Sequence, residues 1–259
     1  MDFQSIKDIA IYGTDCIVDI SRGDDETTRI ISAREKYFDF KLENGQLTVT
    51  QKSRNVFYRI ILRRFELKVV LPKNFKGKLR FRNKNGGIYV KNCDFTDIEV
   101  STRNGKFEME NITANEIELE MSNGSIAVKN IRMSGEAYVR CKNGNIRAES
   151  MTAGELSLSG ANAGISAIDI QSAKFECSTS NGAIDASAIA CENIRLKTSN
   201  GKINALPLGA RDDYRLAVET AHGSITVDGV PYKNISDAAG AKKRLYAKTS
   251  NGEIDIKFM

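Results

Sequence analysis

The sequence predicts a single all-β domain, a β-solenoid with about 19–20 residues per coil, and three observations lead to this prediction. A short motif recurs at a nearly constant step. Apolar residues occupy the same offsets in every repeat, and one outward position alternates in charge from repeat to repeat. Self-similarity at a fixed period of this size is typical of proteins that stack one structural unit on the next.

The recurring motif is Ser-Asn-Gly-x-Ile, and its asparagine serves as a marker for each repeat. The first seven markers are 19 or 20 residues apart, and the last two steps are 22 and 29. Because asparagine and glycine tolerate a positive φ, the motif predicts a corner of the chain, where stacked asparagines can hydrogen-bond to one another. The marker positions hold Asn85, Asn104, Asn123, Asn143, Asn162, Asn181, Asn200, His222 and Asn251.

Apolar residues recur six and four positions before each marker and three, five and eight positions after it. Alternation is the signature of a strand, so each repeat holds two strands and one further inward position after a corner. We therefore expect a narrow three-sided coil whose inward residues stack about 4.8 Å apart. The column eight positions after the marker extends to Leu208 and Val230. In the first repeat the inward residues are Leu79, Phe81, Ile88, Val90 and Cys93.

The alternative is an antiparallel meander, because Asn-Gly is also the strongest signal for a tight hairpin turn. A meander does not require the same offset to be apolar in every repeat, and it leaves the position eight residues after the marker without a partner. The outward position six residues after the marker reads Lys91, Glu110, Lys129 and Glu149 in consecutive repeats. Stacked strands favour such alternation of charge, so the solenoid is preferred.

The two ends of the chain depart from the regular pattern. We expect residues 1–76 to form irregular N-terminal coils that also cap the stack, and residues 77–230 to form the regular coils. Residues 231–259 form an interrupted last coil without an evident cap. An uncapped coil predicts a possible route to a homo-oligomer or filament, by stacking near Ile254 and Ile256.

The net charge of +5 conceals one strongly basic stretch. Residues 51–92 hold thirteen Lys and Arg and one acidic residue, Glu66. Alternation along strands predicts that many of these side chains share one basic face. Such a face could bind an anionic lipid or wall polymer, and nucleic acid is a weaker candidate. The alternative is that the charges keep the protein soluble and protect a sheet edge. The candidate residues are Arg59, Arg63, Arg64, Lys68, Lys76, Lys78, Arg80 and Arg82.

A second candidate surface is the charge-poor part of the middle coils. A flat, uncharged solenoid face is a plausible contact for another protein, and a weakly decorated surface without a partner is the alternative. The candidate contact residues are Ser157, Ser159, Ser166, Ile168, Ser178 and Leu206.

The sequence offers no pattern that indicates catalysis, a metal or a cofactor. The five cysteines are widely spaced without a CxxC pair and predict buried, reduced thiols. His222 occupies a marker position and is interpreted as a substituted corner residue. A carbohydrate-active solenoid enzyme would need acids on neighbouring coils, whereas Asp185 and Asp255 are expected to lie several coils apart.

Three segments before the repeats, together with the repeats themselves, resemble the bacterial "putative adhesin" family of unknown function. They are residues 14–20 (Thr-Asp-Cys-Ile-Val-Asp-Ile), 44–49 (Asn-Gly-Gln-Leu-Thr-Val) and 67–72 (Leu-Lys-Val-Val-Leu-Pro). The resemblance covers nearly the whole chain. It implies a right-handed parallel β-helix and an association with the cell envelope or its stress responses.

These observations together predict a non-enzymatic binding or scaffold module that presents flat β faces to an unknown protein or to an anionic envelope component. The start of the chain shows no signal peptide pattern, and no apolar stretch is long enough to span a bilayer. The sequence thus predicts a cytoplasmic or peripherally membrane-associated protein, while the family resemblance indicates the cell envelope.

Overall fold

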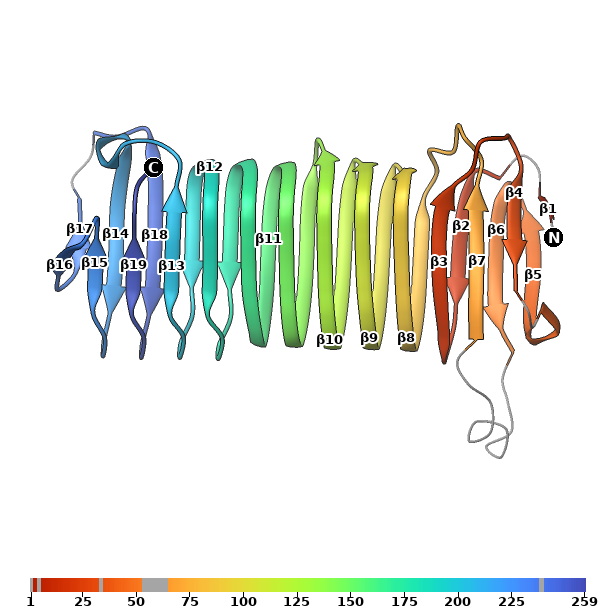
Figure 1. Ribbon diagram of the computed structural model, residues 1–259, viewed down its shortest axis with the longest axis horizontal. Helices are drawn as coiled ribbons and strands as arrows, with labels where there is room; N and C mark the ends of the chain where they lie inside the picture. Colours follow the sequence, from red (N-terminus) through yellow and green to blue (C-terminus); the bar gives the residue numbers. More distant parts are fainter. Residues whose placement is uncertain (1, 4–5, 33–34, 53–64, 238–239) are drawn as a thin grey trace, which may run out of the picture.

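The computed structural model of the protein describes residues 2–3, 6–32, 35–52, 65–237 and 240–259, and it is an elongated stack of β-coils (Figure 1). Its strands belong to one hydrogen-bonded sheet that winds around a single apolar core. The described residues contain no α-helix, and their only helical segments are two three-residue 3-10 turns. The predicted all-β fold is confirmed.

The regular part of the stack consists of six strands, several of which continue through the corners of the coil. They are β8 (Leu79–Asp94), β9 (Asp97–Ala114), β10 (Glu116–Met133), β11 (Glu136–Ser178), β12 (Ile184–Lys197) and β13 (Ile203–Pro207).

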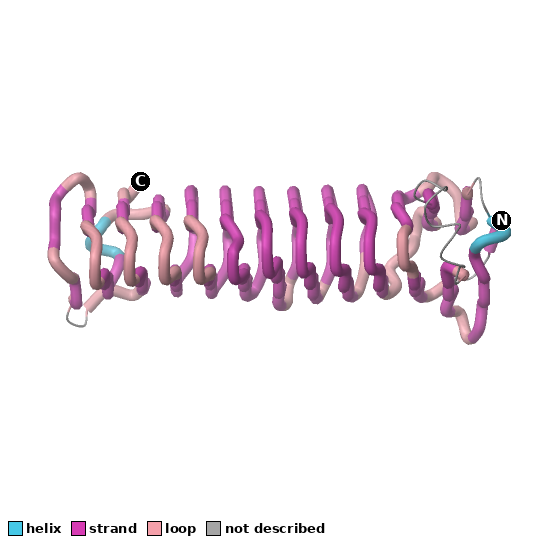
Figure 2. Tube along the Cα trace, turned by 90° about the horizontal axis from the view of Figure 1, so that it is seen from below, coloured by secondary structure: helices cyan, strands magenta, loops and turns pink. Residues whose placement is uncertain are grey.

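Irregular groups of shorter strands flank this part, and Figure 2 shows them at the two ends of the stack. The N-terminal group contains β1 (Asp2–Phe3), β2 (Asp8–Tyr12), β3 (Cys16–Arg22), β4 (Thr28–Ile31), η1 (Glu35–Tyr37), β5 (Phe38–Glu43), β6 (Gln46–Gln51) and β7 (Phe65–Leu71). The C-terminal group contains η2 (Arg211–Asp213), β14 (Tyr214–Thr220), β15 (Ile225–Val227), β16 (Val230–Tyr232), β17 (Ile235–Ser236), β18 (Lys243–Thr249) and β19 (Ile254–Ile256).

Neighbouring coils of the regular part pair in parallel, with equivalent residues side by side. Leu79 lies beside Ile98, and Ile98 lies beside Ile117, so these partners are 19 positions apart. Parallel pairing of this kind excludes the antiparallel meander for these strands. The inward columns are buried as expected, and Ile88 and Phe107, for example, are each 1% exposed.

The third side of the coil contributes two inward positions where the sequence pattern indicated one. Residues ten positions after the marker are buried too, and they are Phe95, Ala114, Met133, Ala153, Ser172 and Cys191. Because the side chains at this position differ in size and polarity, the repeated apolar pattern does not include it.

The prediction that Leu208 and Val230 point inward is wrong, because they are 37% and 52% exposed. Leu208 directly precedes the turn at which the chain leaves the stack toward η2. Val230 lies in β16, which folds back antiparallel onto β15. At both positions the chain leaves the coil, so the repeat no longer determines whether the side chain points inward or outward.

The marker asparagines form a continuous ladder of side-chain hydrogen bonds, as predicted. Each Nδ2 donates to Oδ1 of the neighbouring marker at 2.7–2.9 Å. At one end Asn85 donates to Asp15 Oδ1, and at the other the ladder passes from Asn200 directly to Asn251. A second, shorter ladder joins Asn92, Asn111 and Asn130, all at positive φ. The sequence pattern predicted a corner here but not its asparagine ladder.

The glycine after the marker is required by the close approach of the next coil. A Cβ atom on Gly105 would lie 1.4 Å from the carbonyl oxygen of Gly86, and one on Gly124 would lie 1.9 Å from that of Gly105. Gly124 also has a φ of +134°. In these coils an L side chain does not fit without moving the corner backbone, whereas the coil of Asn162 has the buried Ala163 at this position, with Gly160 next to its Cβ.

The last coil is not at the end of the stack, and here the predicted order is wrong. Strand β18 pairs with β12 on one side and with β14 on the other. Strand β19 likewise lies between β13 and β15, so that Ile254 is beside both Ile203 and Ile225 (Figure 1). Neither edge of these strands is open, and the stacking route to an oligomer through Ile254 and Ile256 loses its basis.

The N-terminal end is threaded in the same way. Strand β2 lies between β6 and β8, and β3 lies between β7 and β8, so residues 8–22 form an inner coil. The outer coils at both ends are covered by antiparallel strands. These are β4 on β7 and β5 on β6 at one end, and β16 on β15 and β17 on β14 at the other.

Gly124→Ala should lower the free energy of unfolding by about 2 kcal/mol or more, because the added methyl group meets backbone rather than a movable side chain. Urea unfolding followed by circular dichroism measures the change. Gly164→Ala is the matched control, since the nearest atom to its Cβ is Asn145 Oδ1 at 3.1 Å. Equal losses in the two variants would contradict the close-approach explanation.

Backbone amides of Leu245, Ala247 and Ile254 should exchange with solvent within about tenfold of the rates in β10, because their strands are paired on both edges. Hydrogen–deuterium exchange with mass spectrometry measures these rates. Rapid exchange across residues 243–256, as in a fraying terminal coil, would contradict the inserted position.

Candidate functional site

The residues just before each marker form one flat surface, because successive side chains of these strands point alternately into the core and out to solvent. We call this surface the charged face, and it consists of the outward residues seven, five and three positions before each marker. In the coil of β8 these are Lys78, Arg80 and Arg82.

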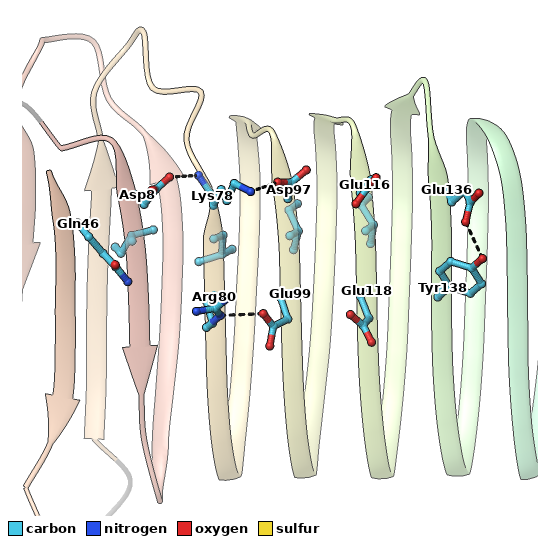
Figure 3. Close-up of a pocket in the computed structure, with 14 residues that line it drawn as sticks. Asp8, Gln46, Lys78, Arg80, Asp97, Glu99, Glu116, Glu118, Glu136 and Tyr138 are labelled. Carbon is cyan, nitrogen blue, oxygen red and sulfur yellow. Dashed lines mark hydrogen bonds and ion pairs between the residues drawn. The ribbon is translucent and has the colours of Figure 1, made fainter. Parts of the chain in front are cut away.

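A groove of about 420 Å³ lies on this face, at its N-terminal end. Side chains from β8, β9, β10 and β11 line it together with Asp8 of β2 and Gln46 of β6 (Figure 3). The arrangement is polar and open and contains both signs of charge.

Cations of the first regular coil are neutralised by acids of the second. The Nζ of Lys78 is 2.7 Å from Asp97 Oδ2. Arg82 Nη2 and Arg80 Nε each donate to one carboxylate oxygen of Glu99, at 2.7 Å (Figure 3 shows Arg80 and Glu99). Hydrogen bonds from Arg82 and Arg80 lower the pKa of Glu99. The three predicted anion-binding side chains are therefore already paired.

The other residues of the predicted basic face do not join them. Lys68 of β7 is exposed but stacks in the column of Asp19 and Tyr89, beyond the marker corner. Lys76 is exposed in the connection between β7 and β8. Arg59, Arg63 and Arg64 lie outside the described residues. The structure thus gathers Lys78, Arg80 and Arg82 on one face and separates Lys68 from them.

The next coils of the charged face are acidic. Glu116, Glu118 and Glu120 follow one another on β10, and their carboxylates form no ion pair or hydrogen bond with any other residue that the structure describes. Asp97 is beside Glu116, and Glu136 starts the following strand, where its carboxylate accepts a hydrogen bond from Tyr138 at 2.6 Å. We call Asp97, Glu99, Glu116, Glu118, Glu120 and Glu136 the acidic half.

The far end of the same face is basic, which the sequence reading missed. Insertion of the last coil places Arg244 and Lys248 of β18 between Arg195 and Lys197 of β12 and Arg215 of β14. The guanidinium of Arg195 lies 4.7 Å from the ring centroid of Tyr246, and Lys248 pairs with Glu219 at 2.7 Å. We call Arg195, Lys197, Arg215, Arg244 and Lys248 the basic half.

The predicted charge-poor contact surface is divided between two faces. Ser157, Ser159 and Ser178 lie on the charged face, between its acidic and basic halves. Ser166, Ile168 and Leu206 lie beyond the marker corner, on the neighbouring face. There Ile168, Ser187 and Leu206 stack on consecutive coils. We call these last three residues the uncharged strip.

The described residues contain no group of three or more His, Cys, Asp or Glu side chains that could hold a metal ion. The five cysteines are buried and free, and burial raises the pKa of Cys16 and Cys93 to about 12. Asp185 and Asp255 are closer than predicted, because the inserted last coil leaves only Asn204 between them. Asn204 donates to Asp185, and the hydroxyl of Thr226 donates to Asp255 at 2.8 Å.

The fold and this surface define the chain as a β-solenoid with flat, chemically distinct faces. The chain belongs to the Toastrack DUF4097 family, whose model matches residues 6–259. No curated protein matches it. Among the residues that the structure describes, no helix is of a length and apolar character to cross a membrane.

Two solved structures share the fold at low sequence identity. One is the "putative lipid binding protein" from Parabacteroides distasonis ATCC 8503, with a TM-score of 0.55 and 16% identity, covering 100% of this chain and 95% of that one. The other is a "putative adhesin" from Parabacteroides merdae ATCC 43184, with a TM-score of 0.51, 11% identity and the same coverage.

Arg82→Ala should raise the pKa of Glu99 toward the ordinary value of about 4.3, because it removes the strongest interaction that favours the carboxylate. A carboxyl titration followed by NMR measures this. Since the folded-state pKa is lowered, the stabilisation is present above pH about 4.3 and is lost as pH falls through the folded-state value. The pair is exposed, so the loss of stability should be about 0.5 kcal/mol or less.

Arg103→Ala, an exposed arginine near the same coil, is the control. A titration of Glu99 that is identical in the wild type and the Arg82 variant would contradict the pairing.

Proposed function

We propose that this chain is a non-enzymatic binding or scaffold module linked to the bacterial cell envelope, and that it presents a flat β face to a protein partner. The observation that carries this proposal is the uncharged strip. In the first four regular coils the same column holds Lys91, Glu110, Lys129 and Glu149. Two ion pairs connect them, Lys91 with Glu110 at 3.3 Å and Lys129 with Glu149 at 2.9 Å.

At Ile168 the column changes from paired charges to uncharged side chains. Ile168 and Leu206 are half-buried but point outward, where isoleucine and leucine gain nothing from contact with water. Interface cores are depleted in charge in the same way, whereas their rims stay polar. A protein contact on this face explains the change of composition along the column.

A membrane-binding function is the second candidate, and it is supported by the name of the Parabacteroides distasonis protein with the same fold. The pairing in the first coil of the charged face favours the protein partner, because Lys78, Arg80 and Arg82 are neutralised by Asp97 and Glu99. Attraction to an anionic membrane depends on basic side chains that are free to approach it.

An enzymatic function is the weakest candidate. The names of the two solved structures with this fold refer to adhesion and lipid binding. Asp185 and Asp255, the acids nearest to a catalytic arrangement, are each engaged by a neutral hydrogen-bond donor on a neighbouring coil. A right-handed winding with 19–20 residues per coil throughout is part of the same proposal, and it agrees with the 19-residue register of β8 to β10.

The test is a photo-crosslinking amino acid placed at Ser187, inside the uncharged strip, and, as the matched control, at Glu108 in the charged part of the same face. Irradiation of the native cells should give an adduct with a discrete second protein from position 187 and not from 108. Ile168→Asp together with Leu206→Asp should reduce the adduct yield about tenfold or more, since a charge buried at an interface is costly.

Absence of any adduct from position 187 would contradict the protein-binding function. Sedimentation with phosphatidylcholine vesicles, with and without added phosphatidylglycerol, tests the lipid alternative. Binding that requires phosphatidylglycerol and is lost in Lys68→Glu with Lys76→Glu would support a membrane surface instead.

A further inference from the structure

We propose that the charged face is the interface of an antiparallel homodimer. The face has two halves of opposite charge, the acidic half on β9 to β11 and the basic half on β12, β14 and β18. A second copy rotated by 180° about an axis that lies in the interface, parallel to the strands, turns its charged face onto the first copy and places each acidic half on the partner's basic half. The same patch then serves both copies, as in any twofold-symmetric interface.

The order of the coils determines where this axis passes. Along the face the acidic coils end at Glu136 and the basic coils begin at Arg195, and the coils of Leu156 and Phe175 lie between them. An axis between these two coils superimposes the coil of Glu136 on that of Arg195, and the coil of Glu116 on that of Arg244. Ser157, Ser159 and Ser178 are then at the centre together with the charged Glu155, Lys174 and Glu176, and Glu155 of each copy faces Lys174 of the other.

The rotation keeps the strand direction, so residues at the same offset from the marker come opposite one another. Glu116 faces Arg244 of the second copy, and Glu120 faces Lys248. In the adjacent coils Tyr138 faces Arg195, and the like-charged Arg140 and Lys197 come opposite one another. Tyr138 is 52% exposed, and Arg195 already lies over one aromatic ring, so a second ring can cover its other side.

The area of this surface suits a dimer of modest affinity. Eight coils at about 4.8 Å and strand segments of five residues at about 3.3 Å give about 650 Å² per copy, or about 1,300 Å² in total. This is at the low end of specific protein interfaces, of about 1,200–2,000 Å². Because the contact consists mainly of exposed charges, it should be sensitive to salt.

The proposal does not depend on the protein partner proposed above. In the dimer the charged faces are covered, and the two uncharged strips, which lie beyond the marker corner, stay accessible. A homodimer therefore offers two copies of the partner-binding surface.

Sedimentation velocity of the full chain tests the proposal at about 20 mM and about 500 mM salt. We expect a dimer at low salt that dissociates as salt rises. Two charge-reversed variants, Glu116→Lys with Glu120→Lys and Arg244→Glu with Lys248→Glu, should each raise the dimer dissociation constant about tenfold or more. Mixing the two variants should restore a dimer. The reversed acidic half of one variant then meets the reversed basic half of the other, and the two unchanged halves meet each other.

Glu108→Lys with Glu110→Lys on the neighbouring face is the control for the acidic reversal, with the same change of net charge and no expected effect on dimerisation. Far-UV circular dichroism confirms that each variant is folded. A monomer at low salt, a dimer that both reversals leave unchanged, or a mixture that stays monomeric would overturn the proposal. None of these results affects the crosslink at Ser187, so the two proposals fail separately.

Discussion

The structure depends on the close approach of successive coils at the marker corner. A Cβ atom on Gly105, Gly124 or Gly144 would lie between 1.4 and 1.9 Å from the carbonyl oxygen of the preceding corner. The asparagines beside these glycines can reach one another only at this spacing, and they satisfy their polar groups in an unbroken ladder. The parallel register follows, and with it the separation of each coil into inward and outward positions.

Inward and outward positions are therefore under different constraints. Inward columns are restricted to residues that pack on their neighbours, and even the cysteines fit this role as small buried side chains. Outward columns are free to vary without loss of fold. The compositions of the charged face and the uncharged strip are therefore set by contacts at the surface and not by the fold, because the backbone beneath them is the same.

The sequence predicted the coil interior well and the order of the coils poorly. Offsets from the marker identified Ile88 and Phe107 as core because every repeat obeys the same packing constraint. The same uniformity hid the threading, since identical repeats pair equally well with any neighbour. Arg244 and Tyr246 were thus separated from Arg195, and the basic half of the charged face was not recognised. Ion pairs such as Arg82 with Glu99 also depend on register, which composition alone does not give.

The inserted coils constrain how this chain reaches its folded state. Residues 214–227 are synthesised before residues 243–256, yet their strands rest on β18 and β19 rather than on the coil that precedes them. Sequential addition of one coil to the next therefore stops at β13. The position between β12 and β14 and between β13 and β15 must stay empty, or become accessible again, until β18 and β19 insert there. At the other end β8 stacks on β2 and β3 while the intervening chain is set aside. A solenoid that grows by nearest neighbours thus closes at both ends by long-range steps, which are slower to form and resist unravelling from the termini.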